Sequence, residues 1–286
     1  MAVIDSHHHF WDRPDDYAWM SDLTPIRRPF GPDDLAPIVS RLEIDRTILV
    51  QARGSLEETA NLLAVAAGTT FVGGVVGWVD LTAPDVADTL DRLRQLPGGD
   101  RLVGIRHQVQ DEEDPDWLLR SAVERGIAAV GEAGLAYDLL VQPRELPAAL
   151  ETVGALPEVR FVIDHLAKPP IRDGEVQPWA ELMEPFGELE NAWCKVSGMV
   201  TQADWETWRP ADLVPFVDEV LEVFGPRRLM FGSDWPVCLL AATYEQVYEA
   251  ARLALGDLSE VEQAAVFGES AARVYRLGRG GQRPPD

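Results

Sequence analysis

The chain has 286 residues, of which 46% are hydrophobic and 26% are charged, and its formal net charge at pH 7 is −23. A field of this sign repels phosphate backbones and anionic lipids, so nucleic acid and membrane surfaces are excluded as expected partners. A small neutral or polar molecule is a better candidate for the ligand of this chain than a polyanion. The length and composition suit one α/β barrel of about 250 residues with extensions.

The N-terminal segment, MAVIDSHHHFW, has neither the basic region nor the apolar core of a signal peptide. No apolar run reaches the roughly 18 residues that a membrane span needs. The two cysteines, Cys194 and Cys238, lack CxxC spacing and are expected to be buried free thiols. These features predict a cytoplasmic protein, whereas the oligomeric state stays unknown.

Short apolar runs rich in Val, Ile and Leu alternate with helical patterns along the whole chain. Their nearly continuous apolar character is typical of parallel strands that are buried on both faces. The runs interpreted as strands are 2–8, 46–52, 70–79, 101–108, 135–141, 160–165, 193–199 and 228–234.

Amphipathic stretches follow these strands, and two of them open with Ser-x-x-Glu capping boxes, at Ser55 and Ser259. The predicted helices are 55–67, 84–96, 116–133, 144–155, 178–190, 211–224, 243–255 and 259–276. Residues 11–32 form a long first loop with tryptophans and prolines, which favours a lid or a wall of a binding site. The Gly- and Pro-rich tail 278–286 is expected to be disordered.

Eight strands, each followed by a helix, predict an α/β fold: a (β/α)8 TIM-like barrel that forms a single domain over residues 1–277. The competing topology is a doubly wound open sheet. That fold usually carries a glycine-rich phosphate loop after its first strand, and here the first strand ends in histidines instead.

Titratable residues gather at the carboxyl ends of the predicted strands, where the active sites of such barrels lie. The residues at these ends are His7, His8, His9, His107, His165 and Asp234. Because side chains alternate along a strand, Asp5, His7 and His9 are expected on one face and His8 on the other. Two inward imidazoles suit a divalent metal or the polarisation of a carbonyl, whereas His8 is expected to be structural.

Asp234 lies in the segment FGSDWP, where a carboxylate beside histidines is placed as a general base or proton shuttle. The alternative is an N-cap of the following segment. His165, in VIDHLAKPP, is placed to bind a metal or hold a substrate carbonyl, and the alternative is a core histidine. Its neighbour Asp164 is expected to point the other way and to be structural.

Further residues near the strand ends are candidate substrate contacts. Arg106 and His107 are adjacent, so they cannot both face the barrel axis, and the sequence leaves open which one does. A guanidinium there would grip a carboxylate or hydroxyl groups. The other candidates are Lys168, Trp78, Gln51 and Trp235.

Five motifs in register resemble the amidohydrolase superfamily, in its amidohydrolase 2 branch. More narrowly they resemble the sugar lactonase group that includes L-fuconolactonase and L-rhamnono-lactonase. The likeness runs from residue 2 to about 276. The motifs are DSHHHFW (5–11), VGWVDL (77–82), GIRHQ (104–108), DHLAKP (164–169) and GSDWPV (232–237).

This resemblance implies hydrolysis of a sugar-acid lactone, an aldonolactone such as L-fucono- or L-rhamnono-lactone. It implies that Asp234 is the general base and that His7, His9 and His165 polarise the carbonyl or hold an ion. The chain has no strand-five histidine and no metal-bridging lysine on strand four, so it departs from the binuclear pattern. One divalent cation such as zinc on the same four residues and metal-free catalysis both stay open.

Two other functions stand beside the lactonase. One is a metal-dependent decarboxylase or amide hydrolase on the same barrel, and the other is a non-catalytic sugar-binding barrel. The sequence does not identify the lactone or its ring size.

Overall fold

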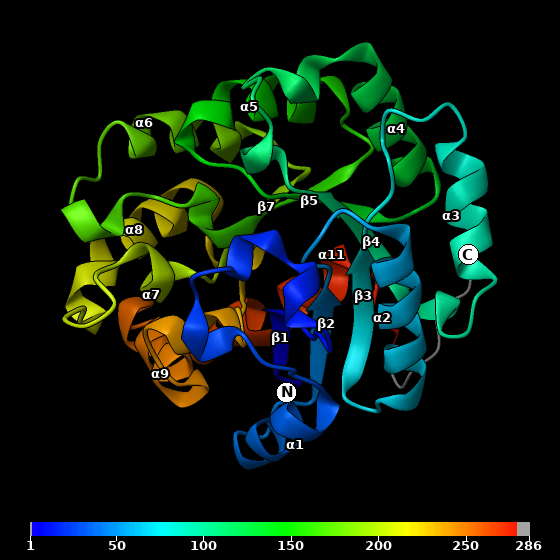
Figure 1. Ribbon diagram of the computed structural model, residues 1–286. Coiled ribbons are helices and arrows are strands. Elements are labelled where there is room, and N and C mark those ends of the chain that lie inside the picture. The colour runs from blue at the N-terminus through cyan, green and yellow to red at the C-terminus, as the bar shows by residue number, and fades with distance from the viewer. Residues whose placement is uncertain (1, 279–286) are drawn as a thin grey trace.

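The computed structural model describes residues 2–278, so most of the tail predicted to be disordered lies outside the described residues. Eight parallel strands pair in chain order, each with the next, inside a ring of helices (Figure 1). The strands are β1 (Ile4–His8), β2 (Arg46–Val50), β3 (Val72–Gly77), β4 (Leu102–His107), β5 (Ala136–Leu139), β6 (Arg160–Ile163), β7 (Ala192–Val196) and β8 (Leu229–Phe231). The predicted (β/α)8 barrel is confirmed: seven strands lie inside their predicted ranges, and β7 begins one residue before its range of 193–199.

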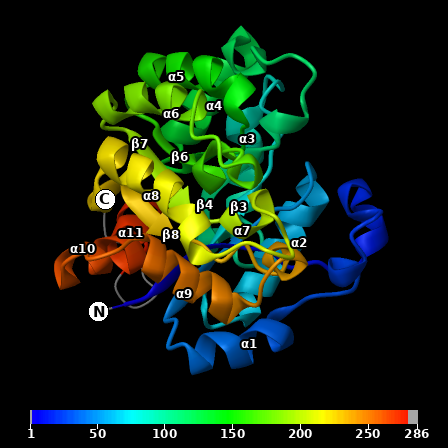
Figure 2. The ribbon, with the colours of Figure 1, turned by 90° about the vertical axis from the view of Figure 1, so that its left-hand side faces the viewer.

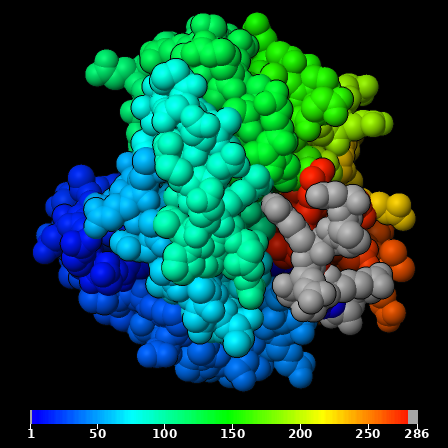
Figure 3. All heavy atoms as spheres, turned by 90° about the vertical axis from the view of Figure 1, so that its right-hand side faces the viewer, coloured from blue at the N-terminus to red at the C-terminus, as the bar shows by residue number. Residues whose placement is uncertain are grey.

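The helices pack outside the sheet, and Figure 3 shows the side that carries α2 and α3. The helices are α1 (Pro32–Arg41), α2 (Leu56–Gly68), α3 (Val86–Arg94), α4 (Ser121–Glu132), α5 (Leu146–Ala155), α6 (Trp179–Met183), α7 (Met199–Gln202), α8 (Pro210–Phe224), α9 (Tyr244–Ala254), α10 (Glu260–Ala264) and α11 (Ser270–Val274). The sequence pattern missed α1, which contains Pro37, and the single-turn α7. No helix within residues 2–278 combines the length and the apolar character that crossing a bilayer requires.

The barrel closes where β1 meets the residues that follow β8. The His9 amide donates to the Trp235 carbonyl at 2.7 Å, and the Asp234 amide donates to the His7 carbonyl at 2.8 Å. These two backbone bonds continue the parallel pairing across the seam. They also place the end of the first strand and the end of the last strand side by side.

Asp5 fastens this seam from outside the barrel. Its carboxylate accepts hydrogen bonds from the Ser233 amide at 2.9 Å, the Ser233 hydroxyl at 2.6 Å and the Tyr244 hydroxyl of α9 at 2.8 Å. The prediction that Asp5 shares a face with His7 and His9 is therefore wrong. The strand register shifts between Asp5 and His8, and this irregularity breaks the simple alternation.

The barrel interior is apolar at the amino ends of the strands and charged above. The lower layer is built from Ile4, Ile48, Val50, Val76, Ala136, Val162 and Met230, and Tyr275 after α11 packs against it. Above it lie the buried charged groups of Arg106, Asp138, Asp164 and Lys195. The buried charged groups therefore lie toward the carboxyl ends of the strands, where the active sites of this fold are found.

The segment 11–30 lies at the opposite end of the barrel from α10 and α11 (Figure 2). It contains three short 3-10 turns, and Trp11 and Phe30 exchange backbone hydrogen bonds at its base. Buried Glu58 of α2 anchors it by accepting from the Tyr17 hydroxyl at 2.7 Å. Only half of the capping box predicted at Ser55 forms, because the Glu58 carboxylate binds Tyr17 and the amides of residues 52 and 53 instead.

Asp5→Ala should lower the free energy of unfolding by about 3 kcal/mol or more, because it leaves buried donors of the seam without an acceptor. Tyr244→Phe is the matched control, since it removes one donor to the same carboxylate and should cost about 1–2 kcal/mol. Guanidinium unfolding of both variants measures this. Equal losses in the two variants would contradict the role assigned to Asp5.

Candidate active site

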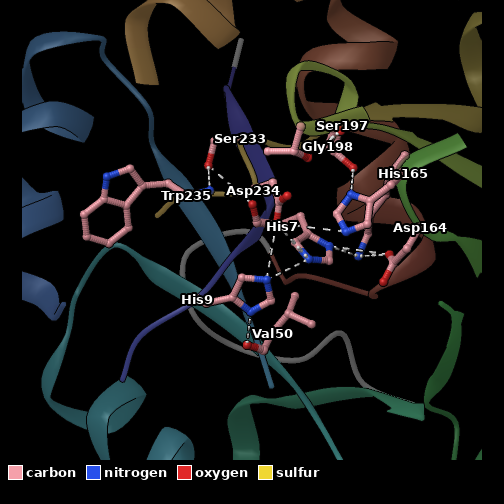
Figure 4. Close-up of polar contacts among 12 residues, drawn as sticks. His7, His9, Val50, Asp164, His165, Ser197, Gly198, Ser233, Asp234 and Trp235 are labelled. Atoms are coloured by element: carbon pink, nitrogen blue, oxygen red, sulfur yellow. Dashed lines mark hydrogen bonds and ion pairs between the residues drawn. The ribbon is translucent and has the colours of Figure 1, made fainter. Parts of the chain in front are cut away.

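Three imidazoles and one carboxylate converge at the carboxyl end of the barrel (Figure 4). The Nε2 atoms of His7 and His9 lie 3.2 Å apart. One carboxylate oxygen of Asp234, Oδ1, lies 3.4 Å from Nε2 of His9, 3.8 Å from Nε2 of His7 and 4.0 Å from Nε2 of His165. Residues that are far apart in the sequence therefore share one centre.

The rings of His9 and His165 are held by partners behind them. His9 Nδ1 donates to the Val50 carbonyl at 2.8 Å, and Nε2 of the same ring faces the centre. His165 Nδ1 lies 2.8 Å from the Ser197 hydroxyl. Gly198, at φ 62°, lies against the same ring, and a Cβ there would come within 2.6 Å of Nδ1. The turn after β7 thus fixes the orientation of His165.

The backbone after β6 departs from strand geometry. His165, Leu166, Ala167 and Lys168 all have φ between 53° and 56°. Because the chain turns there, side-chain alternation ends at Asp164, and both Asp164 and His165 face the barrel interior. Asp164 lies 3.4 Å from Nδ1 of His7 and 2.9 Å from the Arg106 guanidinium, so the expectation that it points away is wrong.

Asp234 also has a left-handed backbone, with φ 55°. Its amide is used in the barrel seam, and its carboxylate faces the imidazoles rather than the amides of the following turn. That turn begins after Pro236 and has no side-chain cap. The geometry therefore favours a role in the centre over an N-cap.

Four buried charges lie beneath His7, and sequence reasoning missed two of them. Lys195 Nζ lies 2.6 Å from Asp138, 2.9 Å from Asp164 and 3.1 Å from Nδ1 of His7. Arg106 pairs with Asp164 on the other side. The available signal was a single charged residue in each of the otherwise apolar strands β5 and β7, at Asp138 and Lys195.

The surroundings set the charge of each group in the centre. Burial lowers the pKa of His165 to about 4, and burial together with the positive charge of Lys195 lowers the pKa of His7. Burial raises the pKa of Asp234, but the neighbouring His165 and His9 outweigh it and the net pKa is below the usual value. At neutral pH the centre therefore holds the neutral imidazoles of His7 and His165 beside an ionised carboxylate.

A cavity of roughly 280 Å³ opens over this centre. The residues that line it include four of the predicted site residues, His9, His165, Asp234 and Lys168. Arg106 also lines it, so of the adjacent pair Arg106 and His107 it is Arg106 that faces the pocket. Trp19 and Leu23, from the long first loop, form part of the wall.

The remaining predicted contacts lie behind this lining. His107 stacks on Trp117, with ring centroids 4.3 Å apart, and accepts from the Trp78 indole at 3.0 Å. Gln51 is fully buried and donates to the Arg106 carbonyl at 3.1 Å. Trp235 is buried and points away from the imidazoles (Figure 4). His8 likewise bonds Thr47, away from the centre.

The donor set of the centre fits a divalent cation. The ligand atoms of His7, His9 and Asp234 lie within 4.8 Å of one another, and those of His7, Asp164 and His165 form a second such group. Imidazole nitrogens with a carboxylate oxygen are the ligands that zinc takes in catalytic sites. The bond from His9 to Val50 is the kind of outer contact that orients a ligating histidine.

Comparisons with known proteins agree with one another. A family profile described as "Amidohydrolase" matches residues 4–277. Proteins from Burkholderia multivorans and Burkholderia ambifaria, both named L-fucono-1,5-lactonase, are each 39% identical over 287 positions, covering 96% of both chains. The crystal structure of an amidohydrolase from Burkholderia multivorans with bound zinc has a TM-score of 0.91 and 38% identity, covering 97% of this chain and 100% of that one.

Lys195→Met should lower the free energy of unfolding by about 3–5 kcal/mol, because it leaves two buried carboxylates with one cation. The double variant Lys195→Met/Asp138→Asn removes one charge of each sign and should recover much of that loss. Urea unfolding of both proteins is the measurement. A double variant less stable than the single one would show that the charge balance is not what matters.

Proposed function

This chain belongs to the amidohydrolase family, and from that premise we propose that it hydrolyses a sugar-acid lactone, with L-fucono-1,5-lactone as the leading substrate. The observation that carries the proposal is that Asp234, His9 and His165 line one cavity and that Asp234 also lies 3.8 Å from the buried His7. The lactonase names of relatives that cover nearly the whole chain support the choice of substrate.

Ester hydrolysis needs a base for water, and Asp234 has the properties of one. It is ionised at neutral pH, it lines the cavity, and its oxygen lies within 4.0 Å of the nitrogen atoms of three imidazoles. We assign it the proton of the attacking water as the water oxygen bonds to the carbonyl carbon. The same proton passes to the ring oxygen as the carbon–oxygen bond of the ring breaks.

The carbonyl oxygen gains negative charge during this attack and needs donors beside it. The Arg106 guanidinium borders the cavity and lies 3.4 Å from Nε2 of His7. Lys168 lines the same cavity. These two cations lie beside the carboxylates of Asp111 and Asp234 in the lining, and their donors suit a developing oxyanion and then a product carboxylate.

We further assign His7, His9, His165 and Asp234 as the residues that would hold one zinc ion. Bound there, the ion would supply Lewis-acid polarisation of the lactone carbonyl. The protein's own part is to present lone-pair nitrogens and keep them oriented, through Val50 behind His9 and Ser197 behind His165.

Asp234→Asn should lower kcat on L-fucono-1,5-lactone by at least about a hundredfold, because the amide cannot take the proton of water. A pH-indicator dye follows the proton released by each new carboxylic acid. Asp88→Asn, the same change on the exposed face of α3, is the matched control and should keep full activity. Near-full turnover of Asp234→Asn would remove the base assignment, and release of carbon dioxide would point to a decarboxylase.

Elemental analysis should find about one zinc ion per chain, and His9→Ala should reduce that content because one of four ligands is lost. Dialysis against a chelator should lower turnover, and added zinc should restore it. Full turnover by a protein that contains no ion would contradict the metal assignment while leaving the lactonase proposal standing.

A further inference from the structure

Two buried polar atoms of the cavity lining have no hydrogen-bond partner among the described residues. They are Nε of Arg106, a donor, and Oε1 of Gln110, an acceptor. Buried polar atoms in native proteins are almost always paired, so an unpaired one requires an explanation. Both atoms belong to residues that border the cavity.

Gln110 is held in place by three contacts. Its amide donates to the Leu140 carbonyl at 3.1 Å, its carbonyl accepts from Arg144 at 3.3 Å, and its side-chain nitrogen donates to Asp111 at 3.3 Å. The side-chain nitrogen is therefore occupied, and the free oxygen keeps a fixed position. An acceptor that is ordered before binding loses little freedom when a ligand arrives.

The neighbouring glutamine shows the same arrangement. Gln108, which also lines the cavity, donates its side-chain amide to Gln51 at 3.0 Å, and Gln51 donates in turn to the carbonyl of Arg106. This chain of bonds uses the Gln108 nitrogen as a donor within the protein. The loop after β4 thus presents fixed amide groups beside the catalytic residue Arg106.

We propose that Gln110 is a specificity-determining residue whose side-chain oxygen accepts a hydrogen bond from a ring hydroxyl of the lactone. The inference rests on the proposed function and deepens it, because it restricts the substrates to hydroxylated lactones. An ester carbonyl can accept a hydrogen bond from Nε of Arg106. Only a hydroxyl or another donor can pair with the side-chain oxygen of Gln110. A lactone without hydroxyl groups leaves Gln110 unpaired and is disfavoured.

The test compares two lactones on one enzyme. L-Fucono-1,5-lactone carries ring hydroxyls, and δ-valerolactone has a six-membered ring without them. Gln110→Leu should lower kcat/KM on the hydroxylated lactone by about 10- to 100-fold, mainly through KM, because a buried hydroxyl then lacks its partner. Its activity on δ-valerolactone should stay within about twofold of wild type.

Gln95→Leu is the matched control, since it makes the same change at an exposed position after α3 and should alter neither activity. Equal losses on both lactones in Gln110→Leu would show a structural effect and overturn the inference. No loss on either lactone would also overturn it, as would a wild-type preference for δ-valerolactone.

A binding measurement separates this inference from the lactonase proposal. L-Fucose keeps the ring hydroxyls but has no ester to hydrolyse. Millimolar L-fucose should raise the melting temperature of the wild type and raise that of Gln110→Leu much less. If the wild type hydrolyses neither lactone yet shows this difference, the lactonase proposal fails and the hydroxyl contact stands. Equal shifts in both proteins, or no shift in the wild type, would refute the contact.

Discussion

The arrangement of the active centre depends on one buried charge network, in which Lys195 is shared by Asp138, Asp164 and His7. A lone charge in the barrel interior would cost several kcal/mol of desolvation, so each of these groups needs a neighbour of opposite charge. Arg106 completes the set, which gives two cations and two carboxylates. Burial raises the pKa of Asp138 to about 6 although Lys195 opposes the shift, because this interior solvates charge weakly.

Four members of that network come from the consecutive strands β4 to β7 or their ends, and His7 of β1 joins them only when the barrel has closed. The network lies beneath His7 and contacts Nδ1 of that imidazole, so the other nitrogen, Nε2, faces His9 and Asp234. The same closure is secured from outside by Asp5. The centre is therefore complete only in the closed barrel, because the seam joins the strand of His7 to the segment of Asp234.

Most of the fold followed from the sequence because parallel strands buried on both faces have a continuous apolar pattern, and all eight strands had it. The positions of His7, His9, His165 and Asp234 followed from a topological rule that parallel strand ends meet at one rim. The alternation rule placed His7, His8 and His9 correctly, and it failed only for Asp5 and Asp164, where the backbone is irregular. The register shift after Asp5 and the left-handed backbone at 165–168 redirect side chains, and no single-residue pattern encodes either feature.

Asp138 and Lys195 were missed for a different reason. A charged residue inside an apolar strand indicates a buried ion pair only when its partner is known, and these two are 57 residues apart in the sequence. Helix α1 was missed because Pro37 contradicts helix propensity, while tertiary packing of Leu35 and Val39 outweighs it. In both cases the deciding interaction is between segments that sequence periodicity treats separately.

The site combines side chains on the barrel strands with side chains on the loops that follow them. The imidazoles, Asp234 and the charges beneath them sit on strands or at strand ends, where the seam and the ion network fix them. Gln108 and Gln110 sit in the loop after β4, and Trp19 sits in the loop after β1. On the proposed function, a substitution at Gln110 or Trp19 would change which hydroxyl or ring is held without removing a partner of the buried charges. The physical consequence is that substrate preference can shift while the acid–base centre keeps its geometry, since the two depend on different sets of contacts.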